Sequence, residues 1–342
     1  MFQRTMTTTS YHLSFRAPLH IGERGVGLEE SRTFASADTL FSALCVMWRE
    51  LYGVTKLEKE LLPAFQTDAP PLLLTSAFPY AGSVRFYPRP LGAKVKGDAK
   101  AWRKVRFVSE RRFAQLALGE TLTLEKAHCL NDGAVWVDDK DLPELADWRR
   151  EGVYRFWQHA VTPRVTLDRI TSASALWQLG GVSFNANCGL WFAARCQTEW
   201  QAPLETALRL LGDTGLGGER GAGYGLFTVA RREALVLPDV PNAEQFVTLS
   251  PCAPASAAQL QALTTQGEVR FNLSVRRGWV GSPEAGNLRR QEVWMFDEGS
   301  RLAGSGSASV GRLVNVKPLP EMHDVWRYGF AFPVGVKPCA NV

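Results

Sequence analysis

The amino-acid sequence predicts an α+β fold divided into two domains, with helices on one face of an antiparallel sheet in each. Its 342 residues exceed the usual size of a single hydrophobic core. Strand-like and helix-like segments are interleaved, and a glycine-rich loop occurs late in each half. A duplicated α+β sandwich fits this order. We place the boundary in the linker that contains Pro238 and Pro241, which gives domains 1–237 and 238–342.

Hydrophobic periodicity predicts the elements of the first domain in turn. Alternating apolar and polar residues predict a strand at Tyr11–Arg16. An apolar helical face predicts a helix beginning near Asp38, capped by Ser36 or Asp38. The other elements expected here are a buried strand Leu72–Phe78, an extended stretch Val84–Tyr87, a helix through Phe107–Leu118, a loop or hairpin Thr162–Leu179, a strand Gly189–Cys196, a helix Leu204–Leu211 ended by Gly212, and a strand Leu226–Ala230.

The second domain has weaker but similar signals. Its expected elements are strands at Phe246–Leu249, Val269–Val275, Gln291–Phe296 and Trp326–Phe332, a short helix Ser256–Leu263, and a second glycine- and serine-rich loop Gly304–Gly311.

Composition argues against several protein classes. No run of about 18 apolar residues is present, which argues against a membrane-spanning helix. The start, Met1 to Arg4 followed by a Thr/Ser tract, lacks the apolar region of a secretory signal, so a cytoplasmic location is expected. The six cysteines lack the two-residue spacing of zinc ligands, and we expect buried thiols and neither metal nor cofactor. They are Cys45, Cys129, Cys188, Cys196, Cys252 and Cys339.

Positive charge is concentrated in one segment. The chain has a formal net charge of +5, but Lys94–Arg112 alone contains eight Lys or Arg and two acids, so it carries +6 and the rest −1. Trp102, Phe107 and Phe113 are interleaved with these cations. Cations for phosphates beside aromatic faces for bases are typical of surfaces that bind single strands, although a solvated charged face is the alternative. The expected RNA contacts here are Lys94, Lys96, Arg103, Lys104 and Arg106.

The glycine-rich loop Gly215–Gly225 is the most informative motif. It lacks the Gly-Lys-Ser/Thr of a P-loop and the G-x-G-x-x-G of dinucleotide sites, and it leads from helix to strand rather than from strand to helix. Its small side chains and exposed N–H groups favour close approach of a nucleic-acid backbone, with Arg220 as a cation. A flexible connection is the alternative.

Catalytic patterns are scarce. Among the five histidines only His20, ahead of a glycine-containing loop, is placed to act as a general acid or base, and a hydrogen-bonded or base-stacking role is favoured. Asp38 is expected to cap its helix rather than to act as a ribonuclease carboxylate. No second acidic cluster accompanies Asp138 and Asp139, so a two-metal site is not expected.

The order of short motifs resembles the RAMP superfamily of CRISPR effector subunits. More narrowly, the chain is similar to the family of the fourth Csm subunit of type III-A complexes, although that family has Ser-Asp-Thr where this chain reads Ser36-Ala37-Asp38. The matching stretches span nearly the whole chain. They are Pro18–Gly22, Ser36–Leu44, Pro163–Arg169, the glycine-rich loop, Phe296–Ser300 and Arg327–Gly329.

The resemblance implies two ferredoxin-like (RRM-like) domains, with a thumb-like insertion in the first. It implies a non-catalytic subunit that binds the crRNA 5′ handle and docks both the large polymerase-like subunit and the backbone RAMP subunit. Together with the charge pattern, it adds further expected RNA contacts. These are His20, Arg164, Arg169, Gly217, Gly218, Arg220 and Tyr224.

Three alternatives stay open at this level. The first is a RAMP endoribonuclease that processes crRNA with His20. The second is the equivalent subunit of a type III-B complex, and the third is a protein unrelated to CRISPR that binds a phosphorylated ligand in its glycine-rich loop.

Overall fold

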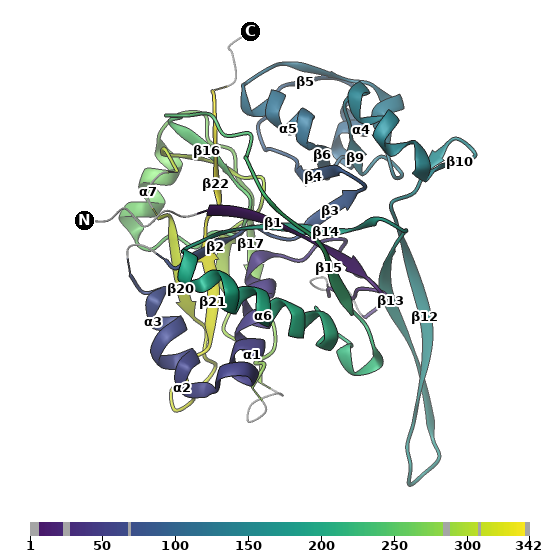
Figure 1. Cartoon of the computed structure of the whole chain (residues 1–342), viewed down its shortest axis with the longest axis vertical. Coiled ribbons are helices and arrows are strands. Elements are labelled where there is room, and N and C mark those ends of the chain that lie inside the picture. The colour runs from purple at the N-terminus through teal and green to yellow at the C-terminus, as the bar shows by residue number, and fades with distance from the viewer. Residues whose placement is uncertain (1–6, 23–27, 68–69, 283–287, 307–308, 339–342) are drawn as a thin grey trace.

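The computed structural model describes residues 7–22, 28–67, 70–282, 288–306 and 309–338 (Figure 1). Expectations for the N-terminal tract, for Cys339 and for parts of the loops at 23–27 and 307–308 lie outside these residues. Helices and strands are mixed along the chain. No helix in the described part is long and apolar enough to cross a membrane.

A nine-stranded sheet organises the described residues. Its order is β15-β1-β14-β3-β4-β6-β9-β8, with β2 also paired to β14. Neighbours are antiparallel except for β6 and β9, so a doubly wound parallel sheet is excluded. The strands are β1 Thr7–Phe15, β2 Leu72–Leu74, β3 Phe78–Ala81, β4 Val84–Pro88, β6 Phe107–Ser109, β8 Cys129–Leu130, β9 Val135–Trp136, β14 Cys188–Cys196 and β15 Phe227–Ala234.

Two helices cover one face of this sheet beside its β15 end. α1 (Ala37–Tyr52) and α6 (Thr198–Thr214) contact each other, and their apolar residues share a core with β1 and β14. The helix expected at Leu204–Leu211 is therefore longer at both ends. Gly212 does not end it, because this glycine lies against β15, where a Cβ would come 2.6 Å from the carbonyl oxygen of Phe227.

A lobe at the β8 end of the sheet contains most of the basic segment (Figure 1). The expected helix through Phe107–Leu118 is wrong at its start, because its first three residues form β6. Ser109 then caps α5 by accepting a hydrogen bond from the Arg112 N–H. The lobe's elements are β5 Val95–Gly97, α4 Ala99–Lys104, α5 Glu110–Ala117, β7 Leu122–Leu124, η2 Lys126–His128, η3 Asp139–Asp141, η4 Pro143–Trp148, β10 Arg149–Arg150 and β11 Val153–Tyr154.

A long hairpin projects from the sheet (Figure 1). It consists of β12 (Trp157–Leu167) and β13 (Ser174–Phe184), paired along their whole length. The prediction of a loop or hairpin at Thr162–Leu179 is thus confirmed, although the strands are longer. The strand expected at Leu72–Phe78 is instead split, because Thr75–Ala77 leaves the ladder between β2 and β3.

The C-terminal half packs into the same cores as the first half. Phe332 and Val334 lie with the residues of β3, β4 and β6, whereas Tyr328 and Phe330 lie with those of α1 and α6. Its elements are β16 Gln245–Thr248, α7 Ala257–Thr265, β17 Leu273–Arg276, β18 Val293–Phe296, β19 Arg301–Ala303, β20 Gly311–Asn315, β21 Trp326–Phe330 and β22 Pro333–Val336. The helix and four of the strands, β16, β17, β18 and β21, overlap the expected positions, whereas β19, β20 and β22 were not expected. The boundary at 237/238 stays a prediction.

Short helical turns complete the chain. The π-helix η1 lies between α2 and α3, directly after α1, and η5 lies inside the glycine-rich loop. They are α2 Val54–Lys56, η1 Leu57–Leu61, α3 Leu62–Ala64 and η5 Arg220–Ala222.

A buried histidine in β1 should make stability depend on pH. His12 packs edge-on against Tyr80, and burial, then the charges of Arg231 and Arg85, lower its pKa to about 3. Below about pH 6.5 the unfolded chain takes up a proton that the folded protein does not, so the free energy of unfolding falls with pH. Urea unfolding of His12→Phe should lack this contribution, which is at most about 1.4 kcal/mol per pH unit. If the free energy of unfolding of His12→Phe has the same pH dependence as that of the wild type, His12 is protonated in the folded protein.

Candidate nucleic-acid interface

A buried ion-pair network connects α1 to the C-terminal half. Asp38, in the first turn of α1, is only 2% exposed, and its carboxylate accepts a short hydrogen bond from Nη1 of Arg327. A second cation, Arg276, places Nη1 3.9 Å from the same carboxylate. Burial acts to raise the pKa of Asp38, but the two arginines outweigh it and hold the pKa below its usual value. The expectation that Asp38 caps the helix is wrong, because Ser36 occupies the N-cap.

Arg276 extends this network to two more acids. Its Nη2 lies 3.0 Å from Asp297 and 3.3 Å from Glu298, and its Nη1 donates to Ser36 Oγ at 2.9 Å. Burial acts to lower the pKa of Arg276, but the surrounding carboxylates raise it above the usual value. Ser36, Asp38 and these partners therefore hold the end of β17 against the start of α1.

The glycine-rich loop is anchored on His20. This histidine is 4% exposed, and its Nδ1 is 2.8 Å from the carbonyl oxygen of Gly180 in β13. The Gly218 N–H donates to the His20 carbonyl at 2.9 Å, and a Cβ on Gly217 would lie 2.4 Å from that oxygen. Gly217 also has φ +96°, which favours glycine. Both glycines thus pack against protein, whereas a Cβ on Gly221 would meet nothing within 4 Å.

A groove of about 970 Å³ lies between this loop, α1 and the chain that follows β17. Four arginines and two acids line it, and Asp38 already pairs with Arg327. Among the described residues, Arg220 makes no ion pair, while Arg277 pairs with exposed Glu292 at 2.5 Å. The charged lining residues are Asp38, Glu219, Arg220, Arg277, Arg290 and Arg327.

An exposed tryptophan lines the same groove. Trp279 is 56% exposed, and the guanidinium carbon of Arg289 lies 5.0 Å from the centroid of its ring. A solvent-accessible indole beside cations is the combination on which unpaired bases stack. The groove therefore offers both cationic hydrogen-bond donors for phosphates and an aromatic surface for bases.

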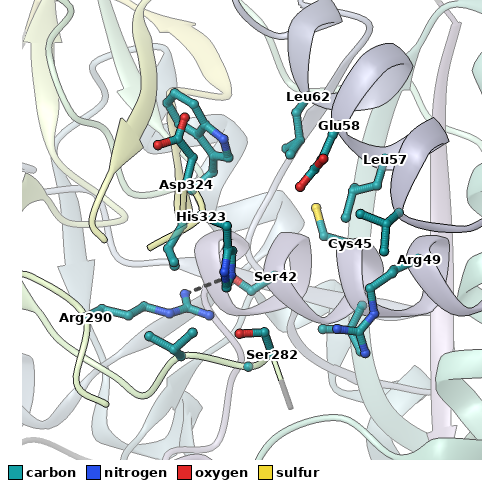
Figure 2. Close-up of a pocket in the computed structure, with 16 residues that line it drawn as sticks. Ser42, Cys45, Arg49, Leu57, Glu58, Leu62, Ser282, Arg290, His323 and Asp324 are labelled. Atoms are coloured by element: carbon teal, nitrogen blue, oxygen red, sulfur yellow. Dashed lines mark hydrogen bonds between the residues drawn. The ribbon is translucent and has the colours of Figure 1, made fainter. Parts of the chain in front are cut away.

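Arg290 separates the groove from a second cavity of about 330 Å³ (Figure 2). Its Nη1 donates to Ser42 Oγ at 3.1 Å, and its Nε is buried without a hydrogen-bond partner. Burial, then the charge of Arg327, lower the pKa of Arg290 to about 10. Even so, the group is a cation at neutral pH.

Two predicted contacts lie where the hairpin meets the glycine-rich loop. The guanidinium carbon of Arg164 is 5.7 Å from the centroid of the Tyr224 ring, which is buried against the hairpin. Arg164 lies within β12, whereas Arg169 lies in the turn beyond it. In this turn Asp168 accepts hydrogen bonds from the N–H groups of Ile170 and Thr171.

The predicted contacts of the basic segment lie elsewhere. Their lobe is at the β8 end of the main sheet, whereas the glycine-rich loop leads into β15 at the opposite edge (Figure 1). The interleaved rings of Phe107 and Phe113 are buried in the core, so this part of the reasoning is wrong. Four of the five predicted cations are exposed and Lys94 is half-buried. The exposed ones are Lys96, Arg103, Lys104 and Arg106.

Sequence reasoning missed the arginines on the C-terminal side of the groove. A search for long charge runs overlooked two Arg-Arg pairs, Arg276-Arg277 and Arg289-Arg290, which flank Trp279. Their short spacing to an aromatic residue was the available signal. In the described residues, no group of three or more His, Cys, Asp or Glu side chains could hold a metal ion.

Comparison with known proteins agrees with the motif order. Residues 241–336 match the model of the CRISPR Csm4 C-terminal domain. A protein of Mycobacterium tuberculosis (strain CDC 1551 / Oshkosh), called CRISPR system Cms protein Csm4, is 31% identical over 287 residues, covering 82% of this chain and 83% of its own. The chain belongs to the Csm4 family. The resemblance to the fourth Csm subunit is thus confirmed, and a protein unrelated to CRISPR is excluded.

Other members of the Csm4 family cover more of the chain. The Csm4 protein of Thermococcus onnurineus (strain NA1) is 29% identical over 90% of this chain and 93% of its own. A chain in the crystal structure of a Csm3-Csm4 subcomplex has the same fold, with a TM-score of 0.69 at 16% identity over 97% of this chain and 100% of its own. A Csm1-Csm4 cassette with cA4 gives 0.61 at 22% identity, over 98% and 100%.

The Asp38 network should be essential for stability. Asp38→Asn leaves two buried arginines without a full counter-charge, and we expect a loss of about 3 kcal/mol in the free energy of unfolding. Asp213→Asn, at an exposed ion pair with Arg16, should change it by less than about 1 kcal/mol. Chemical denaturation of both variants measures the difference. Equal effects would mean that the network is solvated.

The two halves of the glycine-rich loop should respond differently to a methyl group. Gly217→Ala collides with the His20 carbonyl at positive φ, and we expect about 1–3 kcal/mol of destabilisation. Gly221→Ala meets open space and should stay within about 0.5 kcal/mol of the wild type. Melting temperatures compare the two variants, and a stable Gly217→Ala would contradict the anchoring on His20.

Proposed function

We propose that this chain is the non-catalytic subunit of a cytoplasmic type III-A Csm ribonucleoprotein that binds the crRNA 5′ handle. The observation that carries this proposal is the arginine-lined groove between the glycine-rich loop and α1. Two of its arginines, Arg220 and Arg290, make no ion pair among the described residues, so phosphates have cations to bind. Trp279 adds a surface for a base.

The arrangement of partners is proposed from the relatives. A Csm3-Csm4 subcomplex and Csm1-Csm4 cassettes have been crystallised, and this chain shares the fold of chains in them. By that analogy, the chain docks the backbone RAMP subunit and the large polymerase-like subunit. The contribution to RNA-guided antiviral defence follows from membership in this complex.

Two features support ferredoxin-like domains. In the first half, β1, α1, β2 with β3, β14, α6 and β15 follow one another in the β-α-β-β-α-β sequence of that fold. Their spatial order is β15-β1-β14-β3, with both helices in one core. We propose that the β12–β13 hairpin is the thumb-like insertion, and we keep 237/238 as the domain boundary.

The geometry at His20 favours a structural role over catalysis. Its ring is buried and its Nδ1 is engaged with Gly180, while a Cβ on Gly218 would lie 3.0 Å from its Cδ2. Neither ring nitrogen has a carboxylate partner among the described contacts, such as a general base would use. We therefore favour a structural His20 over the endoribonuclease alternative.

Charge-removing variants of the groove should weaken RNA binding. Arg220→Ala with Arg277→Ala removes two cations at the surface, so the slope of log affinity against log salt for a repeat-derived single-stranded RNA should fall by about 1.4, at roughly 0.7 per phosphate contact. Fluorescence anisotropy over a salt series measures this slope. Gly221→Glu should weaken binding by repulsion without changing the melting temperature, since its Cβ meets open space.

The basic segment gives the matched comparison. If Lys94, Lys96, Arg103 and Lys104 contact the same strand, their joint replacement by alanine should lower the slope by about 3. If the salt slope changes only with this set of variants, the RNA binds to the lobe, and the proposed binding in the groove is wrong. If the slope changes with neither set of variants, neither the groove nor the lobe binds RNA through these cations.

A further inference from the structure

The groove borders a second cavity, which we call the side pocket. Ser42, Val46, Val280, Gly281 and Arg290 line both spaces. In Figure 2, Leu57 and Glu58 lie on one side of the side pocket and His323 and Asp324 on another, and the Arg290 side chain reaches Ser42 below them. A strand that follows the groove therefore passes the mouth of the side pocket at Arg290.

The guanidinium of Arg290 makes few contacts that compensate its charge. Its Nη1 donates to a neutral hydroxyl, its Nε has no partner, and among the described residues no carboxylate lies within ion-pair distance. Burying a charge without a counter-charge lowers stability, and a bound anion reverses that loss. A guanidinium at the border of two cavities can hold a phosphate that faces either one.

The side pocket beyond Arg290 has the walls of a base-binding site. Val54, Leu57, Leu62 and Trp326 supply apolar surface, and the volume of about 330 Å³ is at the lower end of the range for small-ligand sites. Polar and charged side chains complete the lining, with Ser42, Arg49, Glu58, Ser282, His323 and Asp324 beside Arg290. Glu58 presents a carboxylate, which accepts hydrogen bonds from an exocyclic amino group of a base.

We propose that one nucleotide of the bound RNA leaves the groove and places its base in the side pocket, with its phosphate on Arg290. Glu58 accepts a hydrogen bond from an N–H donor on the edge of that base. This inference rests on the proposed RNA-binding function and assigns it a specificity-determining subsite. It gives Arg290, which makes no ion pair among the described residues, a ligand and the side pocket an occupant.

A scan with abasic RNA tests the insertion. The full-length chain is titrated with fluorescein-labelled, repeat-derived single-stranded RNAs that lack one base each. Loss of the inserted base should weaken binding by about tenfold at a single position, as expected for one stacked base.

A filled side pocket provides the decisive variant. Val54, 52% exposed at the rim, is replaced by tryptophan, and Val236→Trp, at an 89% exposed valine that lines neither cavity, is the control. In Val54→Trp the affected position should lose its sensitivity, so that abasic and intact RNAs bind within about twofold of each other. In Val236→Trp the tenfold difference should persist.

Arg290→Met gives an independent measurement if Val54→Trp fails to fold. Replacing a half-buried cation that makes no ion pair among the described residues by an apolar side chain should leave the melting temperature unchanged or raise it, while RNA affinity falls at least fivefold. A large drop in melting temperature with unchanged affinity per folded molecule would show that Arg290 is structural, and would overturn the proposal.

Two failures are distinguishable. If Arg220 and Arg277 variants weaken RNA binding but no single base matters, the strand lies in the groove without insertion, and only this inference is overturned. The same holds if Val54→Trp impairs association with a partner subunit and leaves the abasic profile unchanged, because the side pocket then receives a protein. If neither the groove nor the bases matter, the proposed function itself fails.

Discussion

The burial of Asp38 with Arg276 and Arg327 is the constraint on which the functional surface depends. Charges that are removed from water must be paired, and each of these groups finds its partner on the other half of the chain. The network therefore holds the end of β17 and the start of β21 against the first turn of α1. The groove is the space left between these elements and the glycine-rich loop.

The glycine-rich loop contributes shape more than chemistry. Gly217 and Gly218 allow the loop to lie directly on His20, which is itself bound to the base of the hairpin through Gly180. Tyr224 and Arg164 make a second contact between loop and hairpin. A ligand bound to the loop therefore lies near the hairpin, although loop and hairpin are separated in sequence.

The distribution of unpaired cations indicates a division between stability and binding. Arg276 and Arg327 form ion pairs with acids, whereas the half-buried Arg290 beside them forms none among the described residues. A fold optimised for stability alone would place an apolar residue at such a position. The exposed cations of the lobe lie at the opposite sheet edge from the loop, so a single strand would need to cross the sheet to meet both regions.

The sequence by itself determined the local features of this protein. Apolar alternation and helical periodicity located β1, α1, α7 and β14, and motif order identified the family, because these signals depend on neighbouring residues. Other features were decided by the tertiary structure. Asp38 met Arg327 across almost the whole length of the chain, α6 extended past Gly212 because β15 packs there, and Phe107 and Phe113 turned into the core. Such contacts join distant segments, and no local pattern specifies which buried charge will meet which.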